Sequence, residues 1–132
     1  MKILFFINSL KHKSGTERVA CNLANLFSDD LNFEVAIINR DTDFNDAAYH
    51  LSDNVNVIKA AGNFFDFYNQ SQSYIKSFMP DILIFHNNSQ ICFIICIEII
   101  NKMQIFNTLI SLRNRKKKSI KDQQKIIIIA YF

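Results

Sequence analysis

The chain opens with an almost uninterrupted apolar run, Met1-Lys2-Ile3-Leu4-Phe5-Phe6-Ile7. After a polar loop comes the segment Ser14-Gly15-Thr16-Glu17. A continuous apolar run is typical of a strand that is covered on both faces. The spacing of Ser14 and Glu17 fits a capping box, with Ser14 as the N-cap of a helix and Glu17 reaching back to it. This opening therefore predicts a strand, a loop and a helix, the first unit of a parallel α/β sheet.

Strand-like and helix-like segments alternate along the rest of the chain. The first helix is expected over 14–28, where an apolar stripe with helical spacing is formed by Val19, Leu23, Leu26 and Phe27. A second helix is expected over 63–79, ended by Pro80 and packed through Phe64, Phe67, Tyr68, Ile75 and Phe78. Further strands are expected over 33–38, 55–59, 81–85 and 105–112, a third helix over 89–101, and a candidate sixth strand over 126–129. The alternation predicts a Rossmann-like α/β fold, a parallel sheet with helices on both faces.

Length and composition indicate a single domain. The chain has 132 residues, of which 49% are hydrophobic and 20% charged, which is enough to bury a core and too apolar for a disordered chain. We place the domain in 1–114 and a basic, then apolar, tail in 115–132, which resembles a truncated continuation of the same domain. The charge also changes along the chain. Residues 1–112 carry 8 Lys or Arg against 11 Asp or Glu, whereas residues 113–132 carry 7 Lys or Arg against 1 Asp or Glu.

The cysteines and the apolar segments indicate a cytoplasmic protein. Cys21, Cys92 and Cys96 are odd in number and lie in apolar segments, so we expect buried thiols in a reducing compartment, with no disulfide and no metal site. The apolar run over 91–100 corresponds to about 15 Å of helix, half of what a bilayer requires, and is expected to be a core helix. The N-terminus lacks the long apolar region and cleavage site of a signal peptide.

Three loops are expected to meet where the parallel strands end, because ligands of open α/β sheets bind at this carboxyl edge. They contain Gly15, His86 and the basic residues from Arg113 to Lys118. Gly15 lies where a helix N-terminus offers N–H groups to a phosphate, although the pattern is neither GxGxxG nor a Walker A loop, and a simple helix start is the alternative. His86 follows a buried strand, where it either acts as a base or hydroxyl ligand or merely ends the strand.

The other polar and charged residues are expected to lie at the solvent-exposed surface. His12 and His50 lie in polar loops, and Asp41-Thr42-Asp43 has the spacing of a metal motif but follows the second strand in a loop. No aromatic residue interleaves the basic run, so we expect no nucleic-acid partner. A solvated charge run is favoured, with peripheral contact with the inner face of the membrane left open.

The opening segment resembles the start of family 4 glycosyltransferases, retaining enzymes with the GT-B fold. The resemblance rests on the first strand, on Gly15-Thr16-Glu17-Arg18 and on Asn22-Leu23-Ala24, with support from 33–38, from Pro80-Asp81-Ile82-Leu83-Ile84 and from Ile110-Ser111-Leu112-Arg113-Asn114. It covers about residues 1–118. Ser14 stands where the family often has another glycine. The resemblance implies an N-terminal, acceptor-side domain of a GT-B enzyme, without the second domain and its Glu-x7-Glu motif, as in a fragment.

By this resemblance the parent reaction moves a sugar from a nucleotide sugar to a glycan or lipid-linked acceptor. His86 and Arg113 are then candidate catalytic residues, and the candidate donor-phosphate or substrate-binding residues are Ser14, Gly15, Thr16, Asn87 and Asn114. No metal and no cofactor beyond the nucleotide-sugar substrate are implied. A separate chain is one source of the donor-side domain, and the isolated chain is expected to be inactive.

Two further interpretations stay open. One is a non-catalytic Rossmann-type module that binds a nucleotide or phosphate, for which Asp41, near the end of the second strand, is a candidate ribose ligand. The other is an inactive remnant. The sequence does not identify the sugar, the acceptor or the oligomeric state.

Overall fold

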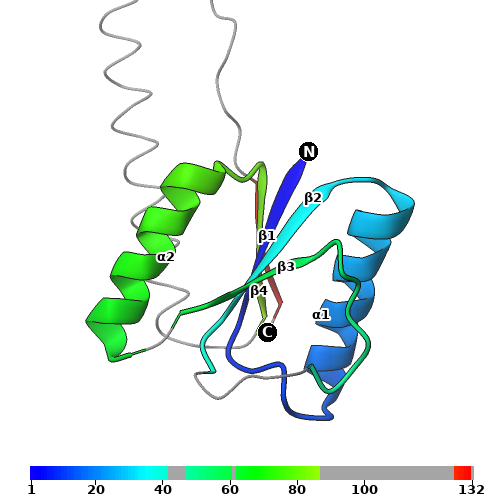
Figure 1. Cartoon of the computed structure of the whole chain (residues 1–132), viewed down its shortest axis with the longest axis horizontal. Coiled ribbons are helices and arrows are strands. Elements are labelled where there is room, and N and C mark those ends of the chain that lie inside the picture. Colours follow the sequence, from blue (N-terminus) through cyan, green and yellow to red (C-terminus); the bar gives the residue numbers. More distant parts are fainter. Residues whose placement is uncertain (42–46, 61, 87–126, 132) are drawn as a thin grey trace, which may run out of the picture.

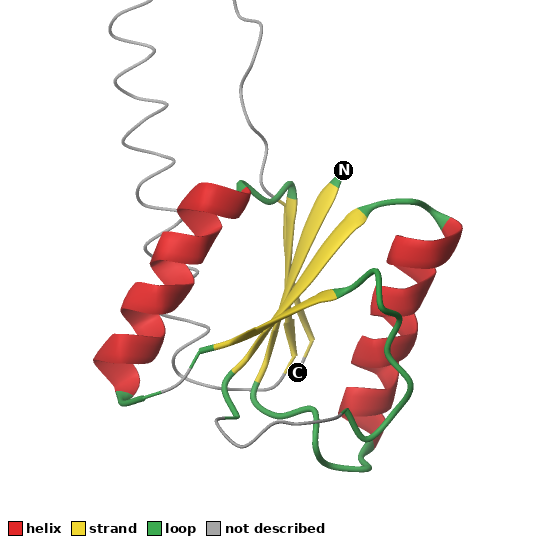
Figure 2. Cartoon of the chain, viewed as in Figure 1, coloured by secondary structure: helices red, strands yellow, loops and turns green. Residues whose placement is uncertain are grey.

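The computed structural model describes residues 1–41, 47–60, 62–86 and 127–131. Five parallel strands form one sheet in the order β3-β2-β1-β4-β5 (Figure 1). The strands are β1 (Lys2–Ile7), β2 (Glu34–Asn39), β3 (Asn56–Lys59), β4 (Ile82–His86) and β5 (Ile127–Tyr131). Helix α1 (Gly15–Asn25) covers one face and α2 (Phe64–Phe78) the other (Figure 2). The expected Rossmann-like α/β fold is therefore confirmed.

Strand β1 is central because it can be buried on both faces. Every residue from Ile3 to Ile7 is buried. Ile3, Phe5 and Ile7 pack in the core layer that includes α1, and Leu4 and Phe6 pack in the layer that includes α2. The apolar run that begins the sequence thus supplies both layers, as predicted for a covered parallel strand.

Helix α1 buries a different stripe from the one expected. Val19 and Leu26 are 47% and 43% exposed, whereas the buried face consists of Glu17, Ala20, Cys21 and Ala24. These four residues also have helical spacing, and three of them are small, which lets the helix lie close to the sheet. The larger Leu23 and Phe27 pack only partly against this layer. A π-helical turn, η1 (Leu26–Asp30), continues the helix.

The predicted capping box at α1 is wrong. Ser14 is the N-cap residue, but its hydroxyl donates to the Glu17 carboxylate instead of accepting from a backbone N–H of the helix. The Glu17 side chain is buried, and its carboxylate is the acceptor of this hydrogen bond. The capping box lies instead at α2, where Asn63 accepts from the N–H groups of Phe65 and Asp66, and the Asp66 carboxylate accepts from the Asn63 N–H.

Helix α2 packs largely as expected. Phe67, Ile75 and Phe78 are buried, and Phe64 and Tyr68 are partly buried against the same layer. The helix ends at Met79, whose φ of 52° is left-handed, directly before Pro80. The predicted stop is therefore confirmed, with a left-handed residue as the C-cap.

The strand beside β4 comes from the end of the chain. Strand β5 pairs with β4 from Ile82↔Ile127 to His86↔Tyr131, in the region that the sequence suggested as a candidate sixth strand. The strand expected over 105–112, the helix expected over 89–101 and most of the tail lie outside the described residues. Among the helices that are described, none combines the length and apolar character needed to cross a membrane.

Candidate functional site

Polar residues end four of the five strands at the carboxyl edge of the sheet. Lys59 pairs with Asn39, Asn39 pairs with Ile7, and His86 pairs with Tyr131. Since Phe6 pairs with Phe85, His86 follows in the same row as Ile7. These residues form one line across the sheet, at the edge where open parallel sheets bind ligands.

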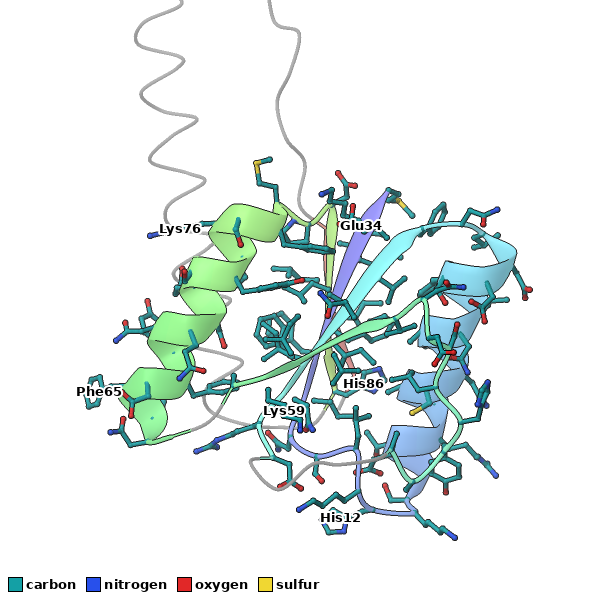
Figure 3. The ribbon with its side chains drawn as sticks, viewed as in Figure 1. His12, Glu34, Lys59, Phe65, Lys76 and His86 are labelled. Carbon is teal, nitrogen blue, oxygen red and sulfur yellow. The ribbon has the colours of Figure 1, made fainter. Side chains whose placement is uncertain are left out.

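His86 lies in this row on the face that α1 covers (Figure 3). It is 3% exposed, and its ring stacks on Phe5 with centroids 6.0 Å apart. Burial lowers the pKa of His86 below its usual value, and the negative charge of Glu17 opposes this effect in part. The imidazole is therefore neutral at pH 7, in the form that can accept a proton or bind a hydroxyl.

The N-terminus of α1 opens at the same edge. Gly15 is the first residue of α1 and is exposed, and a Cβ added to it meets no atom within 4 Å. Within the described residues no side chain caps the first backbone N–H groups of the helix, because the Ser14 hydroxyl bonds to Glu17. Thr16 is partly buried in the first turn. The arrangement leaves positively polarised N–H groups available for an anion.

Glu17 is the residue that sequence reasoning missed. It is 5% exposed, on the buried face of α1, and it acts electrostatically on both His86 and Cys21. Cys21 is a buried free thiol, as expected, and its pKa is raised by burial and by the negative charge of Glu17. Helical spacing is one signal that indicates the burial of Glu17. This spacing places its acidic side chain on the same helix face as the small residues Ala20, Cys21 and Ala24.

A second polar group lies at the end of β2. The Asp41 carboxylate accepts from Ser9 Oγ at 2.9 Å and pairs with Lys11 Nζ at 3.1 Å. The Asp41 N–H donates to Asn39 Oδ1 at 3.3 Å. Asn39 is fully buried, and its Nδ2 has no hydrogen-bond partner in the described ranges. Asp41, the candidate ribose ligand, is thus tied to the loop that follows β1.

The structure brings together only part of the predicted site. Ser14, Gly15, Thr16 and His86 lie around the N-terminus of α1 and the end of β4. Asn87, Arg113 and Asn114 lie outside the described residues, as do Cys92, Cys96 and the basic run. His12 and His50 are exposed, as expected. Within residues 1–41, 47–60, 62–86 and 127–131, no group of three or more His, Cys, Asp or Glu side chains is arranged to hold a metal ion.

No protein-family model matches the chain, and no curated protein matches it. The class that fold and site define is a Rossmann-like α/β domain with a polar carboxyl edge.

Proposed function

We propose that the chain is the acceptor-side domain of a retaining glycosyltransferase similar to family 4. The parent reaction transfers a sugar from a nucleotide sugar to a hydroxyl of a glycan or lipid-linked glycan. A second Rossmann-like domain, in the same chain or a separate one, would hold most of the nucleotide. The single observation that carries the proposal is the place of the motif Gly15-Thr16-Glu17-Arg18, at an N-terminus of α1 that no described side chain caps.

The geometry supports roles for two residues. Gly15 is exposed and has open space at its Cβ position, so a diphosphate could approach the backbone N–H groups closely. His86 faces α1 from the neighbouring strand and is neutral at pH 7, which suits it to bind or deprotonate a hydroxyl. Catalysis in such a site depends on positioning and on stabilisation of the leaving diphosphate.

A transfer assay tests the proposal. The chain is combined with a donor-side domain, by fusion or co-expression, and transfer of labelled sugar to lipid-linked glycans is measured. Gly15→Val should lower the rate about a hundred- to thousandfold, the cost of losing one oxyanion-type donor. The melting temperature should barely move, because Gly15 is helical and its Cβ position is open. Gly15→Ala is the matched control and should keep more activity than Gly15→Val. Full activity of Gly15→Val would mean that Gly15 only begins the helix and does not bind the diphosphate.

A second candidate function is a nucleotide- or phosphate-binding module without catalysis. The observation that favours it is Asp41 near the end of β2, where many dinucleotide-binding folds place an acidic ribose ligand. The contacts of Asp41 with Ser9 and Lys11 would have to yield to a ribose. Weakened binding of a nucleoside diphosphate by Asp41→Asn, with no transfer in the assay above, would favour this function.

A further inference from the structure

Two buried polar groups face the same helix–sheet layer. Glu17 is 5% exposed on α1, and His86 is 3% exposed on β4. The apolar residues of this layer include Phe5, Ile7 and Leu10. Burial of a carboxylate in such a layer is costly unless the charge is compensated by nearby polar groups.

The described contacts of Glu17 account for one part of this compensation. The Ser14 hydroxyl donates to Glu17 Oε2 from the exposed side of the helix start. On the inner side Cys21 lies one turn further along the buried stripe, and its thiol is a weak donor. On the sheet side, His86 is buried and stacks on Phe5, which belongs to the same core layer as the small residues of α1, and the charge of Glu17 raises the pKa of His86.

We propose that Glu17 is a positioning residue whose buried carboxylate holds the His86 imidazole in one orientation and one tautomer at the carboxyl edge of the sheet. The ring is fixed from a second side by its stacking on Phe5. A neighbouring carboxylate favours the tautomer whose N–H points towards it, which leaves the other ring nitrogen to act on a ligand. The link between the two side chains is independent of the reaction; only its catalytic consequence rests on the proposed function.

The charges around His86 make this link measurable. From α1 the groups are Glu17 and Cys21, and from β1 the contact is the apolar Phe5. Strand β5 places Tyr131 in register with His86. The cationic side chains of the loop after β1, including Lys11, lie at the solvent side. Glu17 raises the pKa of His86 against the larger effect of burial, so removal of its charge should lower that pKa further.

Nuclear magnetic resonance of the His86 ring nitrogens tests the proposal on the whole chain. In Glu17→Gln the pKa of His86 should fall, because one nearby opposite charge is lost. Tautomer populations should also become more even, because the carboxylate no longer selects one N–H. Glu34→Gln is the matched control: it removes the same charge at the amino end of the sheet, where Glu34 pairs with Lys2 (Figure 3), and should leave His86 unchanged.

Glu17→Asp sharpens the result, since it keeps the charge on a shorter side chain. The pKa of His86 should stay near the wild-type value while the tautomer ratio changes. If Glu17→Gln does not fold, the wild-type protein still tests the proposal. The chemical shift of the Glu17 carboxyl carbon should then change at the pH where His86 titrates. An unchanged His86 in Glu17→Gln, or no such change in the wild type, would overturn the proposal.

The transfer assay separates this proposal from the proposed function. If the titration shows the link and the combined enzyme transfers no sugar, Glu17 positions His86 and the proposed function fails. If transfer occurs and Glu17→Gln leaves both the titration and the rate unchanged, the positioning role fails and the proposed function stands.

Discussion

The two helix N-termini of this domain are built differently. Both α1 and α2 follow a parallel strand, so both begin at the carboxyl edge of the sheet. At α2, Asn63 and Asp66 form a complete capping box, with two backbone N–H groups bonded to Asn63 Oδ1 at 2.9 and 3.1 Å. At α1, the equivalent pair Ser14 and Glu17 bond to each other, and neither side chain of the described pair caps the first N–H groups.

The difference separates a structural helix start from one that is available to a ligand. The capped N-terminus of α2 has its backbone donors satisfied by its own side chains. At the N-terminus of α1 the acidic residue lies inside the protein, where its charge raises the pKa of His86, and the first residue of the helix is exposed. Local sequence of the same type, a small polar residue followed three positions later by an acid, thus serves two purposes.

The two glycines of the chain give the largest expected contrast between these N-termini. Gly62 has a φ of 107°, and a Cβ there would lie 2.8 Å from the Cβ and Oδ2 atoms of Asp66. Gly62→Ala should therefore lower the free energy of unfolding by about 2 kcal/mol, through backbone strain and displacement of the capping carboxylate. Gly15→Ala should be neutral or stabilising by up to about 1 kcal/mol, because Gly15 is helical with open space.

Urea unfolding of both variants measures this contrast. Equal losses of stability in Gly15→Ala and Gly62→Ala would mean that the start of α1 is as constrained as the start of α2. Such a result would contradict the open conformation of the α1 N-terminus.

Removal of the two N-cap side chains should give a smaller contrast of the same sign. Asn63→Ala should cost about 1 kcal/mol of stability, since two helix N–H groups lose their acceptor. In a Glu17→Gln background, which removes the buried charge that the Ser14 hydroxyl compensates, Ser14→Ala should cost clearly less, because this hydroxyl caps no helix N–H group. Thermal unfolding monitored by circular dichroism compares the two; a larger loss from Ser14→Ala in that background would contradict the account.

The smallest expected effect is on the pH dependence of stability. The pKa of His86 is lowered in the folded protein, so the unfolded chain takes up a proton near pH 6.5 and the folded protein only at lower pH. The free energy of unfolding should therefore fall as the pH drops below about 6.5, by less than about 1 kcal/mol down to pH 5.5. His86→Gln should remove this part of the fall, whereas His50→Gln, at an exposed site, should not. Identical pH profiles for His86→Gln and the wild type would contradict the burial effect.

The sequence predicted the sheet better than the helix faces. The strands β1, β2 and β4 were predictable because continuous apolar runs have few alternatives in a protein of this size. The buried face of α1 was predicted wrongly. Val19 and Leu26 have the spacing and hydrophobicity of a buried stripe, but the small residues Ala20, Cys21 and Ala24 are the ones that are buried against the sheet. Spacing alone does not decide which of two helical stripes gives the tighter fit.

The site was predictable in position and less so in chemistry. The parallel order of the strands places Gly15 and His86 at one edge, and this follows from the sequence. The burial of Glu17 does not follow, because a Ser-x-x-Glu spacing fits a capping box equally well. Only the packing of α1 against β1 and β4 shows that this carboxylate lies inside the protein.

Titration of the 15N-labelled chain with a nucleoside diphosphate tests the difference between the two N-termini most directly. The backbone amides of Gly15, Thr16 and Glu17 should shift in a saturable manner, because no side chain in the described ranges caps them and they lie at the carboxyl edge. The amides of Phe65 and Asp66 should not shift, since Asn63 already accepts from both. No shift at the α1 amides, or equal shifts at both helix starts, would contradict the account.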